Sequence, residues 1–270
     1  MKNLFDLSGK VAVVTGSSKG IGKSIASQMA LHGSNVVVSS RNQKSCDSVA
    51  SEINQSLPEG SGTALGIACH IGKKNDLEHL VTSTKEQLGK IDILVCNAAV
   101  NPFYGSMLEI SDKAYEKVLD SNVKSNHWLS QLVIPDMIKQ GDGVILIVSS
   151  VGGLQGSSTL GTYGVSKAAD IAIVRNISAE FGSYNIRANA IAPGLIRTDF
   201  AKALWENPET LKNSTHNSDK LILDGYKVEK DSTINYPVLG KITVVGLTIN
   251  ELAIKLRNMF INEGQLTNPH

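Results

Sequence analysis

The sequence predicts an α/β fold in which a doubly wound parallel sheet carries helices on both faces. Two observations support this prediction. Between Lys10 and Ile191, six apolar runs of strand length alternate with segments of helical periodicity. A glycine-rich loop directly follows the first run, where open α/β sheets bind ligands. With 270 residues, the chain can bury a full core as one large domain, with or without a small appendage.

The first strand is expected over Lys10–Thr15, and the loop after it leads into a helix that runs to about His32. Strand, glycine loop and helix in this order are the context that a dinucleotide-binding fingerprint requires. The glycines allow a tight turn, and the helix N-terminus offers unpaired N–H groups to a pyrophosphate. We therefore predict a nucleotide site here. The cofactor contacts expected in this loop are Gly16, Ser18, Lys19, Gly20, Ile21 and Gly22.

The second strand, Asn35–Ser39, leads into Ser40 and Arg41. At this point NAD-selective sites usually carry an acidic residue that binds the ribose 2′-hydroxyl, and none is present. Arg41, helped by Lys19, could instead bind a 2′-phosphate through charge-assisted hydrogen bonds. The sequence therefore favours NADP(H), with Ser40 and Arg41 as contacts. The simpler alternative is that both cations are solvated surface residues.

The next elements continue the alternation: a helix over residues 45–55, a strand over 63–69, a helix over 75–88 and a strand over 91–96. His70 ends the third strand and is as well explained by an ordinary loop residue as by an adenine contact. Asn97, Ala98 and Ala99 follow the fourth strand, where small residues let a flat ligand pass close to the backbone. A long helix is then expected over 112–139. It contains Asn122, which taken alone would more often be a satisfied interior amide than a catalytic one.

The fifth strand, Gly143–Val148, is almost purely aliphatic, which is typical of a strand buried on both faces of a parallel sheet. Ser150 lies at its carboxyl end. Tyr163 and Lys167 then share one face of a helix that runs to about Phe181. An ammonium beside a phenol favours the phenolate and lowers a pKa of about 10 towards working pH, so Tyr163 is a candidate proton donor. Since this spacing occurs by chance in many helices, the neighbouring motifs decide its meaning.

Composition limits the partners. Lys and Arg number 26 against 25 Asp and Glu, a net charge of +1 that gives no general attraction to nucleic acid or anionic membranes. No run reaches membrane-spanning length and no metal-ligand spacing occurs, so we expect a small-molecule partner and no metal. Three isolated cysteines indicate reduced thiols in the cytoplasm. Cys46 is expected at the surface, and Cys69 and Cys96 in the core.

The sixth strand, Ile186–Ile191, precedes Pro193 and Gly194, and these complete a set of motifs in family order. The set comprises Thr15-Gly16-x3-Gly20-Ile-Gly22, Asn97-Ala-Ala, Asn122, Ser150, Tyr163-x3-Lys167 and Pro193-Gly194. Over about residues 5–210 the chain resembles the short-chain dehydrogenase/reductase family, in which the serine also precedes the tyrosine by the spacing seen here. Details such as Ser39-Ser-Arg41 and Cys69-His-Ile-Gly72 are similar to the NADPH-dependent carbonyl and retinal reductases of its dehydrogenase/reductase member 4 group.

The resemblance implies a Rossmann-type domain that reduces a ketone or aldehyde to an alcohol, or the reverse, with NADP(H). Tyr163 would protonate the carbonyl oxygen and Ser150 would hydrogen-bond it. Lys167 would also bind the nicotinamide ribose, and Asn122 would hold a water of the proton relay. A homodimer or homotetramer is expected for the family. The further cofactor contacts that the resemblance implies are His70, Ile71, Asn97, Ala98, Ala99, Tyr163, Lys167, Pro193, Gly194, Ile196 and Thr198.

The resemblance ends near Lys212, which divides the chain into a domain over 1–212 and an atypical segment over 213–270. The family's last helix and strand are not visible there. Residues of about 221–268 instead resemble part of the β-rich domain of polysaccharide export proteins, with short β-rich runs and a capping box, Thr248-x-x-Glu251, before a helix to about Phe260. We expect a small β-hairpin and helix, with the sixth strand left near an exposed edge.

Two alternative functions remain open from the sequence. A non-catalytic nucleotide-binding protein is one, because the segment that usually closes the substrate side departs from the family pattern. A polysaccharide-export component is the other, although no signal sequence precedes it.

Overall fold

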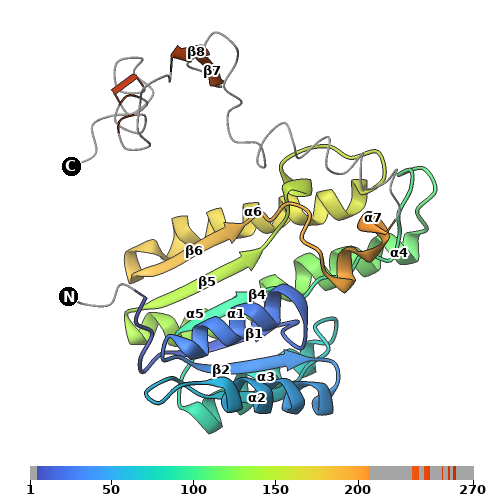
Figure 1. Ribbon diagram of the computed structural model, residues 1–270. Helices are drawn as coiled ribbons and strands as arrows, with labels where there is room; N and C mark the ends of the chain where they lie inside the picture. The colour runs from blue at the N-terminus through green and yellow to red at the C-terminus, as the bar shows by residue number, and fades with distance from the viewer. Residues whose placement is uncertain are drawn as a thin grey trace. The chain divides into compact units, whose positions relative to one another are not determined.

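The computed structural model describes residues 5–206, 233–236, 240–243, 251, 255, 258 and 259. Six parallel strands form one sheet in the order β3-β2-β1-β4-β5-β6 (Figure 1). The strands are β1 (Val11–Thr15), β2 (Asn35–Ser40), β3 (Ala64–Ala68), β4 (Ile93–Cys96), β5 (Gly143–Val148) and β6 (Ile186–Ile191). The main helices are α1 (Gly20–Leu31), α2 (Gln43–Ser56), α3 (Lys74–Leu88), α4 (Asp112–Leu119), α5 (Ser125–Gln140) and α6 (Gly161–Phe181).

The strand order confirms the predicted doubly wound sheet. From β1 the chain moves outward through β2 to β3, and it then crosses back to β4 on the other side of β1. The two neighbours of β1 are therefore reached by connections that run in opposite directions. The space beyond the carboxyl ends of β1 and β4 is such a switch point, where open sheets of this kind bind ligands.

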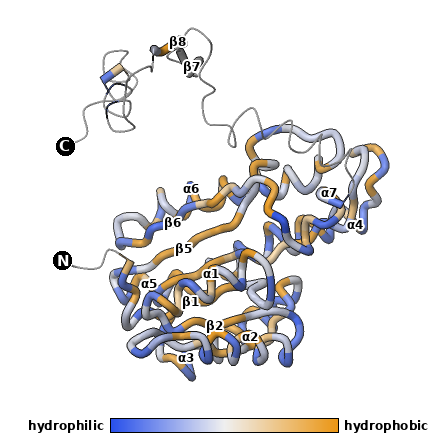
Figure 2. The backbone as a smooth tube through the Cα atoms, in the orientation of Figure 1, coloured by the Kyte–Doolittle hydropathy of each residue, from blue (hydrophilic) through white to orange (hydrophobic). Residues whose placement is uncertain are grey.

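The core has two layers, one on each side of the sheet. Val13, Leu94 and Ile145 point to one side and pack with residues of α3, α5 and α6. Val14 and Val36 point to the other side and pack with residues of α1 and α2. The alternation follows from the two-residue period of a strand, and Figure 2 shows the resulting band of apolar residues along the strands.

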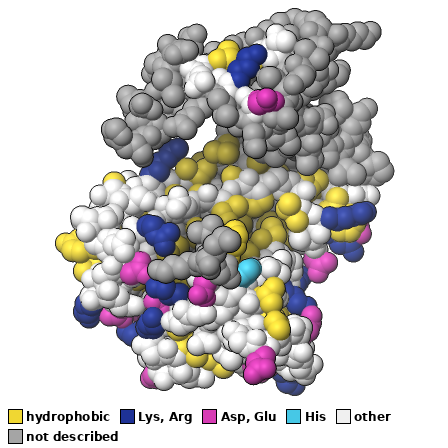
Figure 3. All heavy atoms as spheres, turned by 60° about the vertical axis from the view of Figure 1, so that its left-hand side comes forward, with side chains coloured by type: hydrophobic (Ala, Val, Ile, Leu, Met, Phe, Trp, Pro, Cys, Tyr) yellow, Lys and Arg dark blue, Asp and Glu magenta, His cyan; other side chains and the backbone are white. Residues whose placement is uncertain are grey.

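The expectation that β5 is buried on both faces holds only in part. Ile145 and Ile147 are buried on one side, whereas on the other side Val148 is buried and Val144 and Leu146 are only half-buried. On that side α1 and α2 pack against β1, β2 and β3, and within the described ranges β6 is the edge strand. Figure 3 shows apolar side chains gathered on one face of the described residues. The described helices thus bury less of β5 than its aliphatic composition would lead one to expect.

The single helix predicted over 112–139 is also wrong in one respect. A π-helical turn, η1 (Asp120–Lys124), separates α4 from α5. Such turns accommodate one extra residue in a helix and occur frequently at functional sites. Asn122 lies within η1 and is fully buried.

The three cysteines are free and buried, which corrects the surface position expected for Cys46. The Cys46 thiol accepts a hydrogen bond from the Ser40 backbone nitrogen at 3.1 Å, because α2 packs beneath the end of β2. Burial raises the pKa of Cys69 to about 12 and raises that of Cys96 as well. These thiols are therefore held in the unreactive neutral form.

The chain divides into two compact units, Met1–Lys202 and Ala203–His270. In the second unit, β7 (Thr233–Tyr236) pairs with β8 (Gly240–Thr243) as the antiparallel hairpin that the sequence predicts. Glu251, Lys255 and Met259 are helical, as expected for the segment after the capping box. The predicted boundary at Lys212 and the helix end at Phe260 lie outside the described residues. No helix in the described ranges is both long and apolar enough to span a membrane.

Candidate active site

The glycine loop after β1 has the backbone that the fingerprint requires. Gly16 and Gly20 adopt φ angles of +64° and +57°, which other residues rarely tolerate. A Cβ on Gly22 would lie 2.5 Å from the backbone oxygen of Gly16. The Asn97 side chain donates to the Thr15 and Gly16 oxygens at 2.9 and 3.0 Å, so the end of β4 holds the loop in place.

The beginning of α1 is suited to an anion. Lys19 occupies the N-cap without a capping side-chain hydrogen bond, and the first turn contains no acidic residue. The first N–H groups of the helix therefore face the loop with the positive end of its dipole. A pyrophosphate fits this arrangement, because the backbone can approach it closely where the glycines have no side chains.

A second loop brings the predicted contacts Pro193, Gly194, Ile196 and Thr198 to the same edge of the sheet. The Pro193 oxygen accepts from the Val151 nitrogen at 3.0 Å. A Cβ on Gly20 would lie 3.4 Å from Thr198 Cγ2. The two loops therefore lie close together over the carboxyl ends of the strands.

The two cations of the predicted phosphate clamp, Arg41 and Lys19, are both exposed. Arg41 is exposed just beyond the end of β2. The Lys19 ammonium instead lies 3.2 Å from the Asp199 carboxylate, in an ion pair with both side chains largely exposed. Exposed pairs of this kind are weak, so Lys19 is not held away from a phosphate by more than a small free energy.

His70 has a structural partner in its own loop. Its Nδ1 accepts a hydrogen bond from the Gly72 nitrogen at 3.2 Å, and its backbone nitrogen donates to Asp76 at 3.0 Å. The loop that carries Ile71 is thereby closed at the end of β3. Contact of His70 and Ile71 with an adenine stays a prediction.

Ala98, after the end of β4, lies against the glycine loop. A Cβ on Gly16 would come within 2.8 Å of Ala98 Cα, so only small residues fit between this loop and Ala98.

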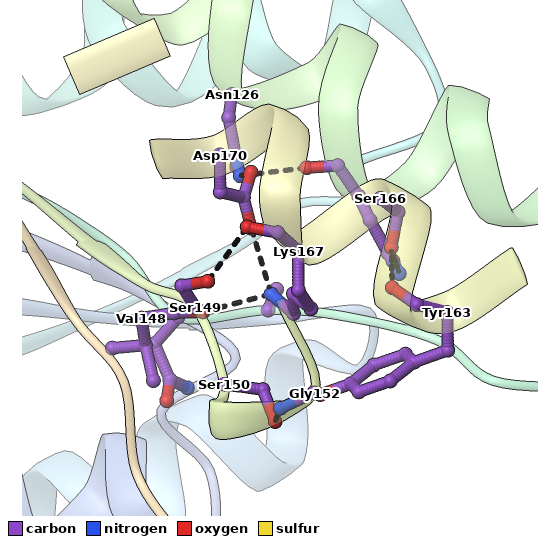
Figure 4. A network of polar contacts seen from close by, with 12 residues as sticks. Asn126, Val148, Ser149, Ser150, Gly152, Tyr163, Ser166, Lys167 and Asp170 are labelled. Carbon is purple, nitrogen blue, oxygen red and sulfur yellow. Dashed lines mark hydrogen bonds and ion pairs between the residues drawn. The ribbon is translucent and has the colours of Figure 1, made fainter. Parts of the chain in front are cut away.

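Ser150 and Tyr163 are brought together by close packing of a short turn, η2 (Val151–Gly153), on α6. A Cβ on Gly153 would lie 2.6 Å from the Lys167 carbonyl carbon, and one on Gly164 would lie 2.7 Å from the Gly152 oxygen. The Ser150 hydroxyl accepts from the Gly152 nitrogen at 3.1 Å, and its interaction with the Tyr163 phenol lowers the pKa of that phenol. Gly153 and Gly164 therefore allow the turn to approach the helix closely. Figure 4 shows Ser150 and Gly152 next to Tyr163.

We expect Gly153→Ala to lower the free energy of unfolding by about 1–3 kcal/mol, because an added methyl group meets the backbone of α6 rather than a movable side chain. Gly156→Ala is a matched control, since Gly156 lies in the same loop and a Cβ there meets nothing within 4 Å. Urea denaturation of both variants measures the difference. Equal stability of the two variants would contradict the packing described.

The predicted effect of Lys167 on Tyr163 is not what the structure shows. Burial raises the pKa of Tyr163 to about 12, and the hydrogen bond from Ser150 only partly opposes this. The charge of Asp170 raises this pKa further. The Lys167 ammonium lies 5.9 Å from the centre of the phenol ring. A shared helix face alone therefore does not make Lys167 a group that lowers the pKa of Tyr163.

Lys167 instead donates to two buried partners. Its ammonium donates to the Val148 oxygen at 2.7 Å and to Asp170 Oδ2 at 2.9 Å. Asn126 of α5 donates to the other carboxylate oxygen of Asp170 at 2.9 Å. Figure 4 shows this network between the end of β5 and α6. It holds a buried positive charge beside a buried negative one, so neither is left uncompensated.

Asn122 is satisfied within the protein. Its amide oxygen accepts from the Val100 nitrogen at 2.8 Å, and its amide nitrogen donates to the Val100 oxygen and to Ser166 Oγ, both at 3.0 Å. The side chain thereby fastens the loop after β4 to α6. The water-relay role implied by the family stays a prediction.

Asp170, Asn126 and Ser17 are site residues that the sequence reasoning missed. Asp170 lies three residues after Lys167, a spacing at which helical ion pairs form, so its signal was present. Asn126 lies one turn after Asn122 on the same helical segment. Ser17 joins the glycine loop to β2 by accepting from the Ser39 nitrogen at 2.8 Å, and a buried serine of this kind gives no signal in a sequence.

Comparison with known proteins matches the two parts of the chain to different families. A family model described as short chain dehydrogenase matches residues 10–209, and one described as polysaccharide biosynthesis/export protein matches residues 203–270. Both resemblances predicted from the motifs are confirmed by these matches.

Individual relatives agree with the first match. Dehydrogenase/reductase SDR family member 4 of Bos taurus is 43% identical over 203 residues, which are 75% of this chain and 71% of the relative. The solved 7α-hydroxysteroid dehydrogenase complexed with NADH and 7-oxo glycochenodeoxycholic acid is 38% identical, with a TM-score of 0.71 over 76% of this chain and 78% of that one. A gluconate 5-dehydrogenase of Burkholderia cenocepacia J2315, in complex with NADP and tartrate, is 25% identical, with a TM-score of 0.72 over 77% and 80%.

Proposed function

Since the chain belongs to the short-chain dehydrogenase family and is an oxidoreductase acting on alcohols and carbonyl compounds, we propose that it reduces a ketone or aldehyde with NADPH. The observation that carries the proposal is the meeting of Ser150 and Tyr163 next to Lys167 at the carboxyl edge of β5. A carbonyl oxygen placed between the serine and tyrosine hydroxyls would receive a hydrogen bond from each.

In this mechanism Tyr163 transfers its proton to the carbonyl oxygen as negative charge develops there. Ser150 stabilises the same oxygen by hydrogen bonding. This hydrogen bond is stronger in the transition state than in the bound substrate, so it lowers the barrier. When bound, NADPH supplies the hydride. The family resemblance gives Lys167 the role of stabilising the phenolate that remains, and the ion pair of Lys167 with Asp170 opposes that role.

The residues present fit a nicotinamide dinucleotide. The pyrophosphate would lie on the glycine loop and the first turn of α1, where no side chain fills the space. Asn97, Ala98 and Ala99 would allow the cofactor to pass along the end of β4. Relatives of known structure include complexes with NADH and with NADP, so fold alone does not set the choice. The choice of NADPH rests on Arg41.

The direct test is a turnover screen of aldehydes, ketones and diketones with both nicotinamide cofactors. Reduction of at least one substrate class, faster with NADPH than with NADH, is the expected result. Fluorescence titration of NADPH in parallel separates binding from turnover. Binding without any turnover would overturn the catalytic proposal.

We expect Arg41→Ala to weaken NADPH binding by about 1–3 kcal/mol while NADH binding is nearly unchanged, because only NADPH carries the 2′-phosphate. Lys44→Ala is the matched control, since Lys44 is an exposed cation of the same segment. Fluorescence titration of both cofactors gives the four affinities. Equal losses for NADPH and NADH in Arg41→Ala would remove the assignment of the 2′-phosphate to Arg41.

A binding protein without turnover is the second candidate. Two observations favour it: the half-buried side of β5 and the engagement of Lys167 by Asp170. In either case the partner is a small molecule. The free cysteines support a cytoplasmic location, and a homodimer is the assembly we propose from the family.

A further inference from the structure

The Lys167 ammonium has little freedom left for the reaction proposed above. An ammonium carries three N–H donors. One is used by the Val148 oxygen at 2.7 Å and one by Asp170 Oδ2 at 2.9 Å. A single donor therefore remains for the phenol and for a cofactor ribose.

Asp170 is fully buried, with a relative exposure of 0%, and Lys167 is 2% exposed. A carboxylate in such a place is costly unless it is paired and hydrogen-bonded. Both conditions are met here, because Lys167 pairs with one oxygen and Asn126 donates to the other. The carboxylate is thus fixed from two helices and cannot turn away from the lysine.

The titratable groups around Asp170 come from two elements and a loop. Lys167 and Tyr163 lie on the same helix, α6, and Cys96 lies at the end of β4. Tyr104, in the loop after β4, acts on Tyr163. Cys96 is held neutral by burial. This leaves Asp170, whose charge raises the pKa of Tyr163, and Lys167, whose ammonium lies 5.9 Å from the centre of the phenol ring.

Resting on the proposed function, we propose that Asp170 is a positioning residue, which fixes the Lys167 ammonium and offsets its charge, and thereby sets the proton affinity of the Tyr163 phenol. With Asp170 ionised, the lysine and aspartate act on Tyr163 as a neutral pair. The phenol then stays protonated over a wide pH range, which suits a proton donor for carbonyl reduction. Alcohol oxidation needs the phenolate and is favoured only at higher pH.

Asp170→Asn removes the negative charge and keeps the shape of the side chain. The uncompensated ammonium should then stabilise the phenolate, and the pH at which Tyr163 titrates should fall by about one unit or more. Ultraviolet difference titration of tyrosine, without cofactor or substrate, measures this directly, with Tyr163→Phe subtracted to isolate the residue. The same change should move the pH profile of alcohol oxidation to lower pH.

Val174→Ala is the matched control, because Val174 is a buried residue of the same helix without a polar partner. It should lower stability and leave the titration of Tyr163 unchanged. An unchanged titration in a folded Asp170→Asn protein would overturn the proposal. If Asp170→Asn does not fold, titration of the wild-type protein tests the proposal. Tyr163 should then titrate near pH 12. A value well below 10 would show that Lys167 acts on the phenol without an offsetting charge.

The tyrosine titration tests the role of Asp170, and carbonyl turnover tests the proposed function, so the two proposals can fail independently. Absence of carbonyl turnover would remove the catalytic assignment and leave the tyrosine titration to be explained by Asp170. A shifted oxidation profile with an unshifted tyrosine titration would preserve the enzyme and refute the role of Asp170.

Discussion

Tyr163→Phe is expected to lower carbonyl turnover by about 100-fold or more, because general acid catalysis by a positioned group contributes factors of that size. The substitution removes the hydroxyl and keeps the ring, which packs near Phe200 with ring centres 6.2 Å apart. Cofactor affinity and stability should therefore change little. Steady-state kinetics, NADPH titration and urea denaturation of the same preparation measure the three quantities.

Tyr184→Phe is the control for loss of a phenol outside the site, since Tyr184 is half-exposed in the turn before β6. It should retain wild-type turnover. If Tyr163→Phe also retained most of its turnover, the tyrosine would not be the proton donor. A loss of NADPH binding with the turnover would mean that the phenol serves the cofactor instead.

Replacing Lys167 by Met should be the most damaging change to stability, with a loss of about 3–5 kcal/mol near neutral pH. The substitution leaves the Asp170 carboxylate buried without its cation, which is more costly than the absence of both charges. Turnover should be lost as well, since no positive charge then remains beside Tyr163. Chemical denaturation at several pH values, compared with wild type, is the measurement.

The pH dependence of this loss has a defined sign. Burial already raises the pKa of Asp170 from 3.8, and the ammonium that opposes this rise is removed in Lys167→Met. The folded variant therefore prefers the protonated carboxyl more than its unfolded chain does. Its stability should fall as pH rises above about 3.8, and the fall should stop once pH passes the raised folded pKa.

A double variant separates charge from packing. In Lys167→Met/Asp170→Asn no buried charge is left, so part of the lost stability should return, while turnover stays absent. Failure of the double variant to regain any stability would show that the single variant suffers from lost packing or lost hydrogen bonds to Val148. The ion pair would then contribute less than its burial suggests.

Local patterns predicted the six strands and the glycine loop because each depends on neighbouring residues. The same local basis explains the two errors of the fold. An aliphatic run such as β5 shows that a strand is apolar, and whether a helix covers each face depends on distant parts of the chain. The π-helical turn contains Asn122, whose hydrogen bonds with the distant Val100 are not encoded in periodicity.

The site shows the same limit. The spacing of Tyr163 and Lys167 placed both on α6, and the motifs brought Ser150 to them. The direction in which the lysine points depends on Asp170 and on the Val148 oxygen, which compete with the phenol for its donors. A sequence gives the residues of such a network and their order, and the competition between partners appears only when their distances are known.

The π-helical turn at Asp120–Lys124 makes this segment sensitive to its length as well as its composition. Loss of one residue there would allow α4 and α5 to join as one continuous α-helix, with regular hydrogen bonding throughout. Every residue on one side of the deletion would then turn by about 100° relative to the other side. Side chains on the turning side would leave their present contacts, although none of them had been replaced. A deletion in this turn is therefore expected to disturb the packing of α4 and α5 more than replacement of its exposed residue Lys124.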